Sequence, residues 1–80
     1  MRFYEHHGKR NICGDRIREA RYKRRLSQSD LSKRLQLAGV MVERDTISRM
    51  ESGERFITDF ELLAIADALE VPVLWLLGKE

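Results

Sequence analysis

Residues 42–55, VERDTISRMESGER, carry the pattern of a short amphipathic helix with a defined end. Ile47 and Met50 lie three residues apart and share one apolar side of a helix, while arginines occupy the other side. Gly53 readily adopts the left-handed conformation that ends many helices. The stretch therefore predicts a helix over about 44–52, and it raises the question of what the polar, basic side contacts.

Glu51 lies one turn after Ile47, so this carboxylate would point into the protein together with the apolar residues. A buried carboxylate needs a charged or hydrogen-bonding partner. Arg21 is the best candidate, because it is otherwise out of place on the apolar side of an earlier helix. We expect an Arg21–Glu51 salt bridge that supports the scaffold and has no direct role in function.

The residues before this helix contain their own start signal, SQSD at 27–30. Ser27 can cap a helix, and Asp30 can reach back to complete a capping box. Leucines one turn apart then face inwards, and a glycine ends the pattern. The small side chain of Ser32 would allow another helix to approach this one closely.

Similar signals mark three further helices. Asp15 is a plausible cap for the first, Thr58 and Glu61 form a second capping box, and Pro72 has the fixed φ suited to a helix start. No alternating pattern typical of a β-strand appears. The fold class that we predict is all-α, a five-helix bundle over residues 15–80. The predicted helices cover approximately 15–24, 28–38, 44–52, 59–69 and 72–77.

Residues 1–14 have no sustained period, so we expect an N-terminal arm that is either flexible or holds its basic residues against a partner. His6 and His7 are adjacent and would point apart, which argues against a metal site. Cys13 is the single cysteine, and it lacks the Cys/His spacing of a zinc site.

The composition indicates one domain of an ordinary globular class, with 80 residues, 42% of them hydrophobic and 35% charged. No apolar run approaches the ~20 residues that span a bilayer, and the N-terminal residues do not resemble a secretory signal. We expect a cytoplasmic protein without a membrane partner. The sequence contains no Gly-rich phosphate loop and no HExxH motif, so we expect no enzyme activity, no cofactor and no small-molecule site.

The small net charge of +2 hides a strong asymmetry. Residues 1–49 hold 13 Lys and Arg against 6 Asp and Glu, whereas residues 50–80 hold 2 against 7. A basic half on a small domain suggests a polyanionic partner, and an unevenly charged, solvated surface is the alternative.

The helices over 28–38 and 44–52 form the most informative pair. Both are short, and the second has polar residues outward, as in a helix-turn-helix whose second helix lies in the major groove. Three stretches resemble the phage repressor and Cro family, the Xre-like helix-turn-helix regulators: IREARYKRRLSQSDLSKRL, DTISRMESGER and FELLAIADALEVPVLWLLG. The resemblance covers roughly residues 15–78. It implies a five-helix bundle of the lambda-repressor type that binds operator DNA, usually as a dimer.

The resemblance also implies roles for single residues. Those implied to contact DNA phosphates are Ser27, Gln28, Ser29 and Arg55. Those implied to contact base edges are Arg44, Asp45, Thr46, Ser48 and Arg49. Gln28 would act together with nearby backbone amides and the helix dipole. Arginine to guanine is the commonest specific base contact.

The chain departs from the family's pattern in two places. Leu35 to Val42 is seven positions, where the usual family spacing is two, so we expect an enlarged turn between the two helices. A changed tilt of the second helix would affect base contacts before phosphate contacts.

The second departure is that Glu43 and Asp45 place acidic side chains near the groove. Asp45 could accept a hydrogen bond from cytosine N4, or it could repel the DNA phosphates. It could also do no more than stabilise the start of the helix through the helix dipole.

The last predicted helix contains VLWLL at 73–77, and one face cannot bury all five apolar side chains. We expect Val73 and Trp75 to be exposed in a monomer and to pack at a twofold homodimer interface, with core filling as the alternative.

The function that we predict is a sequence-specific transcriptional regulator of double-stranded DNA, most simply a repressor. The alternative is a protein-interaction module or antitoxin-like partner protein that uses the apolar C-terminal helix.

Overall fold

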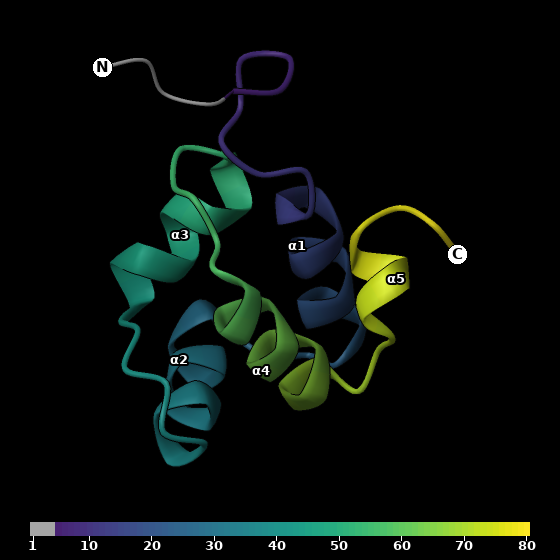
Figure 1. Cartoon of the computed structure of the whole chain (residues 1–80). Helices are drawn as coiled ribbons and strands as arrows, with labels where there is room; N and C mark the ends of the chain where they lie inside the picture. The colour runs from purple at the N-terminus through teal and green to yellow at the C-terminus, as the bar shows by residue number, and fades with distance from the viewer. Residues whose placement is uncertain (1–4) are drawn as a thin grey trace.

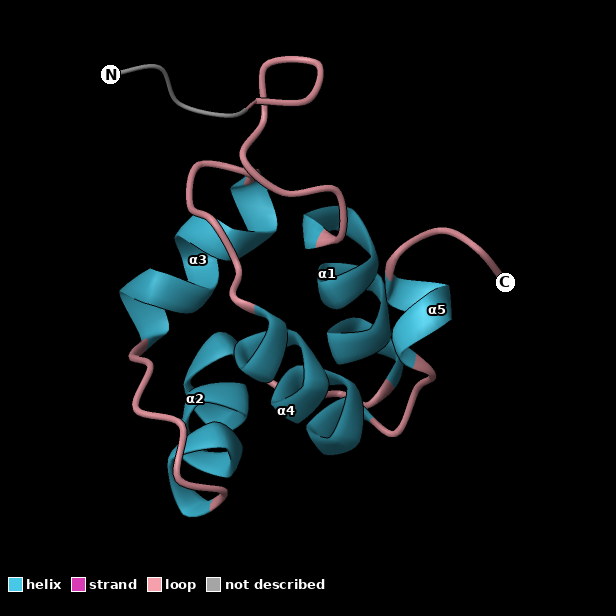
Figure 2. Cartoon of the chain, viewed as in Figure 1, coloured by secondary structure: helices cyan, strands magenta, loops and turns pink. Residues whose placement is uncertain are grey.

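A computed structural model describes residues 5–80, and within them the chain forms five helices and no β-strand (Figures 1 and 2). The all-α prediction is confirmed, and each helix begins and ends within one residue of its predicted bounds. The helices are α1 (Gly14–Lys23), α2 (Gln28–Leu37), α3 (Arg44–Ser52), α4 (Asp59–Leu69) and α5 (Val73–Leu76).

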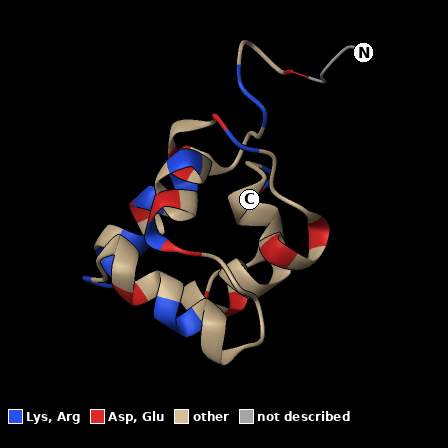
Figure 3. Ribbon diagram, turned by 90° about the vertical axis from the view of Figure 1, so that its left-hand side faces the viewer, with Lys and Arg blue, Asp and Glu red and all other residues tan. Residues whose placement is uncertain are grey.

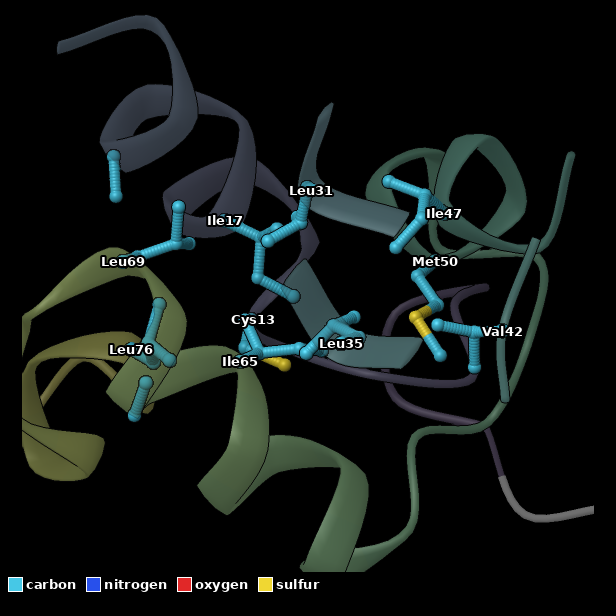
Figure 4. Close-up of a cluster of buried hydrophobic side chains, with 12 residues drawn as sticks. Cys13, Ile17, Leu31, Leu35, Val42, Ile47, Met50, Ile65, Leu69 and Leu76 are labelled. Atoms are coloured by element: carbon cyan, nitrogen blue, oxygen red, sulfur yellow. The ribbon is translucent and has the colours of Figure 1, made fainter. Parts of the chain in front are cut away.

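Helix α3 packs on α1 and α2, whereas α5 packs on α1 and α4. The two helices therefore lie on opposite sides of the bundle (Figure 1). All five helices contribute to one apolar core (Figure 4). Its fully buried apolar side chains include Ile17, Leu31, Leu35, Ile47, Met50, Ile65, Leu69 and Leu76.

Two reciprocal capping boxes fix the starts of α2 and α4, as the sequence predicts. The Ser27 hydroxyl accepts from the Asp30 amide at 2.9 Å, and the Asp30 carboxylate accepts from the Ser27 amide at 2.9 Å. This backbone hydrogen bond from Ser27 lowers the pKa of Asp30. At α4 the Thr58 hydroxyl and the Glu61 carboxylate make the same two contacts, at 3.3 Å and 2.9 Å. Each box provides partners for amides that the helix itself leaves unpaired.

The start of α1 differs from the prediction. The helix begins at Gly14, with Cys13 at the N-cap position and without a side-chain capping bond from it, and Asn11 Oδ1 accepts from the Gly14 amide at 2.9 Å. Asp15 lies within the first turn and is not the cap. A close approach between helices requires a glycine at this first position, because a Cβ atom on Gly14 would lie 2.5 Å from the carbonyl oxygen of Met50 in α3.

The segment before α1 is joined to the end of α3. Asn11 Nδ2 donates to two carbonyl oxygens there, that of Met50 at 3.0 Å and that of Arg55 at 2.8 Å. Residues 10–13 of the expected arm are therefore joined to the bundle next to α1 and α3, whereas residues 5–9 are exposed. Residues 1–4 of that arm lie outside the described residues.

The enlarged turn, residues 38–43, is anchored to α2 rather than looped out freely. The carbonyl oxygen of Val42 accepts from Ser32 Oγ at 2.7 Å and from Gln36 Nε2 at 3.1 Å. The Val42 side chain is buried in the core. The role of Ser32 is thus more specific than a small side chain that permits close packing, because its hydroxyl fixes the turn that leads into α3.

Candidate nucleic-acid interface

The side of α3 that faces away from the core presents the residues predicted to contact bases. Exposed on this side are Arg44, Asp45, Ser48 and Arg49, with Thr46 half-buried beside them. Arg44 Nη2 lies 3.4 Å from Asp45 Oδ1, and both side chains are exposed. Such a pair contributes little energy in water, so Asp45 lowers the local positive charge without fixing Arg44. Figure 3 shows this side of the molecule, where basic and acidic residues lie close together on the helices.

A hollow of about 510 Å³ lies at the start of α2. Its lining residues are Arg21, Tyr22, Ser27, Gln28, Ser29 and Arg44. The hollow brings the predicted phosphate residues at the start of α2 together with Arg44, for which the family resemblance implies a contact with base edges. The first amides of a helix lack partners within the helix, and the helix dipole adds partial positive charge. The arrangement is therefore suited to an anion such as a phosphate.

Glu51 is buried at the junction of α1, α2 and α3. The expected pair is present, since Arg21 Nε donates to Glu51 Oε2 at 2.7 Å and Arg21 Nη2 donates to Oε1 at 3.0 Å. The hydrogen bond to Glu51 raises the pKa of Arg21. Two further groups donate to Oε1, Gln28 Nε2 at 3.2 Å and Arg18 Nε at 3.4 Å. A single carboxylate thus joins three helices and shares its charge among several donors.

Gln28 connects this buried network to the hollow. Its side-chain nitrogen carries two N–H groups, and one of them donates to Glu51. Gln28 also lines the hollow, so its second N–H group is the one that would donate to an anion there. The predicted contact between Gln28 and a phosphate is compatible with the internal hydrogen bond, which holds the amide in one orientation.

Arg55 is held by an internal carboxylate that the sequence analysis did not anticipate. Its Nη1 and Nη2 donate to the two oxygens of Glu61 at 3.0 Å and 3.1 Å, and Nη1 also donates to the Phe56 carbonyl at 2.9 Å. Burial opposes ionisation of Glu61, but these hydrogen bonds and the Thr58 amide outweigh it and lower its pKa. Arg55 therefore keeps only part of its hydrogen-bonding capacity for another partner.

Sequence reasoning missed Asn11 and Arg18 in this region. Arg18 is three residues before Arg21, and this spacing places both on one side of α1, so the second donor to Glu51 could have been found. The contacts of Asn11 with two carbonyl groups have no comparable signal, because these partners lie 39 and 44 residues away along the chain.

The structure corrects the exposure expected for the last helix. Val73 and Trp75 are half-buried and pack against the core. Arg16 of α1 covers the Trp75 ring at 4.7 Å from the ring centre and donates to the Trp75 carbonyl at 2.9 Å. Leu74 is instead the more exposed side chain, at 53%. An apolar contact surface on α5 would therefore be centred on Leu74.

Other kinds of site find little support among residues 5–80. No group of three or more His, Cys, Asp or Glu side chains in this range could hold a metal ion. None of the helices in the same range is long and apolar enough to cross a membrane. Cys13 is buried, and burial raises the pKa of its thiol, which disfavours the reactive thiolate.

The sequence of the helical region matches a known family. The family model described as a helix-turn-helix domain matches residues 13–74, which is most of the chain. The protein belongs to the helix-turn-helix domain family. No curated protein matches the chain.

Solved structures of two helix-turn-helix regulators are similar to this one. The P22 c2 repressor, in complex with synthetic operator 9T in the presence of Tl⁺, is 31% identical with a TM-score of 0.73, and the match covers 88% of this chain and 98% of the repressor chain. The restriction-modification controller protein C.AhdI from Aeromonas hydrophila is 31% identical with a TM-score of 0.67, over 80% of this chain and 86% of the controller. The predicted resemblance is confirmed, and the family and fold are those of DNA-binding regulators.

Proposed function

We propose that this helix-turn-helix protein is a transcriptional regulator that binds double-stranded DNA sequence-specifically and inserts α3 into the major groove. The observation that carries the proposal is the pairing of α3, with its polar side outward, and the open hollow at the start of α2. The major groove is about 12 Å wide and accepts one helix. The apolar side of α3 is buried in the core, so the helix backbone presents its outward side chains from defined positions.

Phosphate contacts would set the position of the protein on DNA. Ser27, Gln28 and Ser29 would hold one phosphate in the hollow, assisted by the backbone amides and the dipole of α2. Arg44 lines the same hollow and would add its charge. Arg55 would contact the backbone with the N–H groups that Glu61 leaves free, while Glu61 fixes the orientation of the guanidinium.

Base contacts would come from the exposed side of α3. Arg49 and Ser48 are the strongest candidates, because both are exposed and neither lines the hollow of α2. Asp45 would accept from cytosine N4, and its weak pair with Arg44 would open for this contact. Thr46, half-buried beside them, would touch a base methyl group or a phosphate.

We further propose that the protein acts as a homodimer and as a repressor in the cytoplasm. The likeness to the P22 c2 repressor supports repression, and a bound protein can exclude others from the same DNA. Leu74 is exposed on α5 and is flanked in the sequence by the partly exposed Val73 and Leu77, and this apolar segment supports a twofold contact. A dimer would place two copies of α3 about 34 Å apart, one turn of B-DNA.

Affinity selection from a random duplex pool at two salt concentrations tests the proposal. We expect an enriched inverted repeat with half-sites one turn apart, and binding that weakens steeply with salt as counterions are released. Absence of any enriched motif would contradict sequence-specific binding. Absence of DNA binding even at low salt would favour the protein-interaction module, which would use α5 on a partner protein.

A further inference from the structure

The enlarged turn carries a tight tip before α3. The Val42 amide donates to the Val40 carbonyl oxygen at 3.1 Å, which closes a three-residue turn with Met41 at its centre. Met41 has a negative φ, so this is an inverse γ-turn, a common and unstrained conformation. Both neighbours are anchored to α2, since the Val40 amide donates to the Leu35 carbonyl at 2.8 Å and Ser32 Oγ donates to the Val42 carbonyl at 2.7 Å. The backbone at Met41 is therefore held in place.

The Met41 side chain takes no part in packing the domain. Val42 is buried in the core, and Val40 lines a groove between the turn and α4. Met41 is 78% exposed, and Leu37 at the end of α2 is 90% exposed. Single exposed apolar side chains are common in proteins, so exposure alone does not indicate a function. The position of Met41 relative to α3 is what distinguishes it.

Met41 precedes Arg44, the first residue of α3, by three positions. Three extended residues span at most about 11 Å, which is close to the ~12 Å width of the major groove. Figure 1 shows the turn joining the outer end of α3 at the edge of the bundle. When the first turn of α3 enters the groove, the tip at Met41 lies within about 11 Å of that turn, which brings its side chain within reach of the rim of the groove.

We infer that Met41 is a further specificity-determining residue, and that its side chain contacts the 5-methyl group of a thymine in the DNA bound by α3. This inference rests on the proposed function and adds to it a residue from the enlarged turn. Thymine is the base that presents an apolar group in the major groove. The flexible, polarisable side chain of methionine packs well on irregular apolar surfaces. The neighbouring Glu43 is exposed and acidic, so it disfavours a contact between this turn and a phosphate.

The test measures the affinity of wild type and Met41→Ala for the selected operator. Each thymine of the operator is replaced in turn by deoxyuridine, which removes the 5-methyl group and keeps the hydrogen-bonding edge. Leu37→Ala is the matched control, because it removes a still more exposed apolar side chain at the other end of the same turn. Melting temperatures of all three proteins show that the fold is unchanged.

Wild type should lose about fourfold in affinity at one thymine of each half-site, the factor that corresponds to ~0.8 kcal/mol for one buried methyl-sized group. Met41→Ala should lose this sensitivity at that thymine alone, and Leu37→Ala should keep it. The inference is overturned if Met41→Ala retains the full deoxyuridine profile, or if wild type is insensitive to deoxyuridine at every thymine. Failure of the proposed function itself is distinguishable, because wild type would then show no preferred duplex at all.

Discussion

At the scale of single residues, Glu51 links the stability of the domain to the geometry of its proposed phosphate site. Its buried carboxylate accepts hydrogen bonds from Arg21 in α1 and from Gln28 at the start of α2. The first contact closes the core between helices, and the second orients an amide beside the hollow that would hold a phosphate. Loss of this carboxylate should therefore affect the fold first and DNA binding as a consequence.

Replacement of Glu51 by alanine would leave Arg21 buried without its carboxylate. Removing one partner of a buried ion pair costs about 3–5 kcal/mol, which is comparable with the total stability of many small domains. We expect Glu51→Ala to be largely unfolded by circular dichroism, with a strongly lowered urea midpoint. Glu54→Ala, at an exposed position, is the control and should keep the wild-type midpoint. An unchanged melting temperature in Glu51→Ala would show that the pair contributes little.

Glu61 should make the stability of the domain depend on pH. Although burial favours its neutral form, the Arg55 and Thr58 hydrogen bonds lower its pKa below the ordinary 4.5. The folded state then binds fewer protons than the unfolded chain, so this contribution is present above pH 4.5 and is lost as the pH falls through the lower folded pKa.

We therefore expect Glu61→Gln to be less stable than wild type at neutral pH and to lose less stability in acid. Urea midpoints measured at neutral pH and across the acid range provide the comparison, with Glu54→Gln as the exposed control. Parallel curves for wild type and Glu61→Gln would argue against a role for this carboxyl in the pH dependence.

At the scale of helices, local signals were sufficient where the partners are close in the chain. Ser27 with Asp30, and Thr58 with Glu61, fix two helix starts within three residues, and the sequence predicted both. The start of α1 was predicted to within one residue, but the contact of Asn11 with the carbonyl of Met50 could not be predicted because 39 residues separate the two. Similarly, the partners of Arg55 could not be predicted, since they depend on how the loop after α3 meets α4.

The contact between α1 and α3 requires a glycine. A Cβ atom at Gly14 would lie 2.5 Å from the Met50 carbonyl oxygen and 2.7 Å from that of Glu51, and both are backbone atoms. We expect Gly14→Ala to lower the free energy of unfolding by about 1–3 kcal/mol, despite the higher helix propensity of alanine. Urea titration measures the effect, and Asp15→Ala, at the exposed next position, serves as the control. If Gly14→Ala is as stable as wild type, the two helices can move apart at this contact without lowering the free energy of unfolding.

At the scale of the whole molecule, the basic and acidic halves of the chain belong to different helices. Residues 1–49 contain α1, α2 and the first six of the nine residues of α3, whereas the acidic residues 50–80 contain the end of α3 together with α4 and α5. Helix α5 lies on the opposite side of the bundle from α3 (Figure 1). The sequence predicted this division of charge. It did not predict which apolar residue of α5 is exposed, because Arg16 covers Trp75 from 59 residues away.

The proposed homodimer should depend on Leu74. We expect wild type to sediment as a dimer at micromolar concentrations and Leu74→Arg to sediment as a monomer that binds the inverted repeat more weakly. Leu63→Arg is the matched control, because Leu63 lies on α4 and is exposed to a similar extent, 55% against 53% for Leu74. A monomeric wild type at these concentrations would contradict the dimer.

The most direct measurement compares the base preference at every operator position for wild type, Arg49→Ala and Lys79→Ala. Arg49 is exposed on the outward side of α3, and Lys79 is an exposed residue after α5 that provides the same change of charge. Arg49→Ala should lower specific affinity by about 1–3 kcal/mol and lose the preference at one base pair of each half-site. Lys79→Ala should keep every preference. If Arg49→Ala also keeps every preference and binds no more weakly than Lys79→Ala, α3 does not read the bases through Arg49.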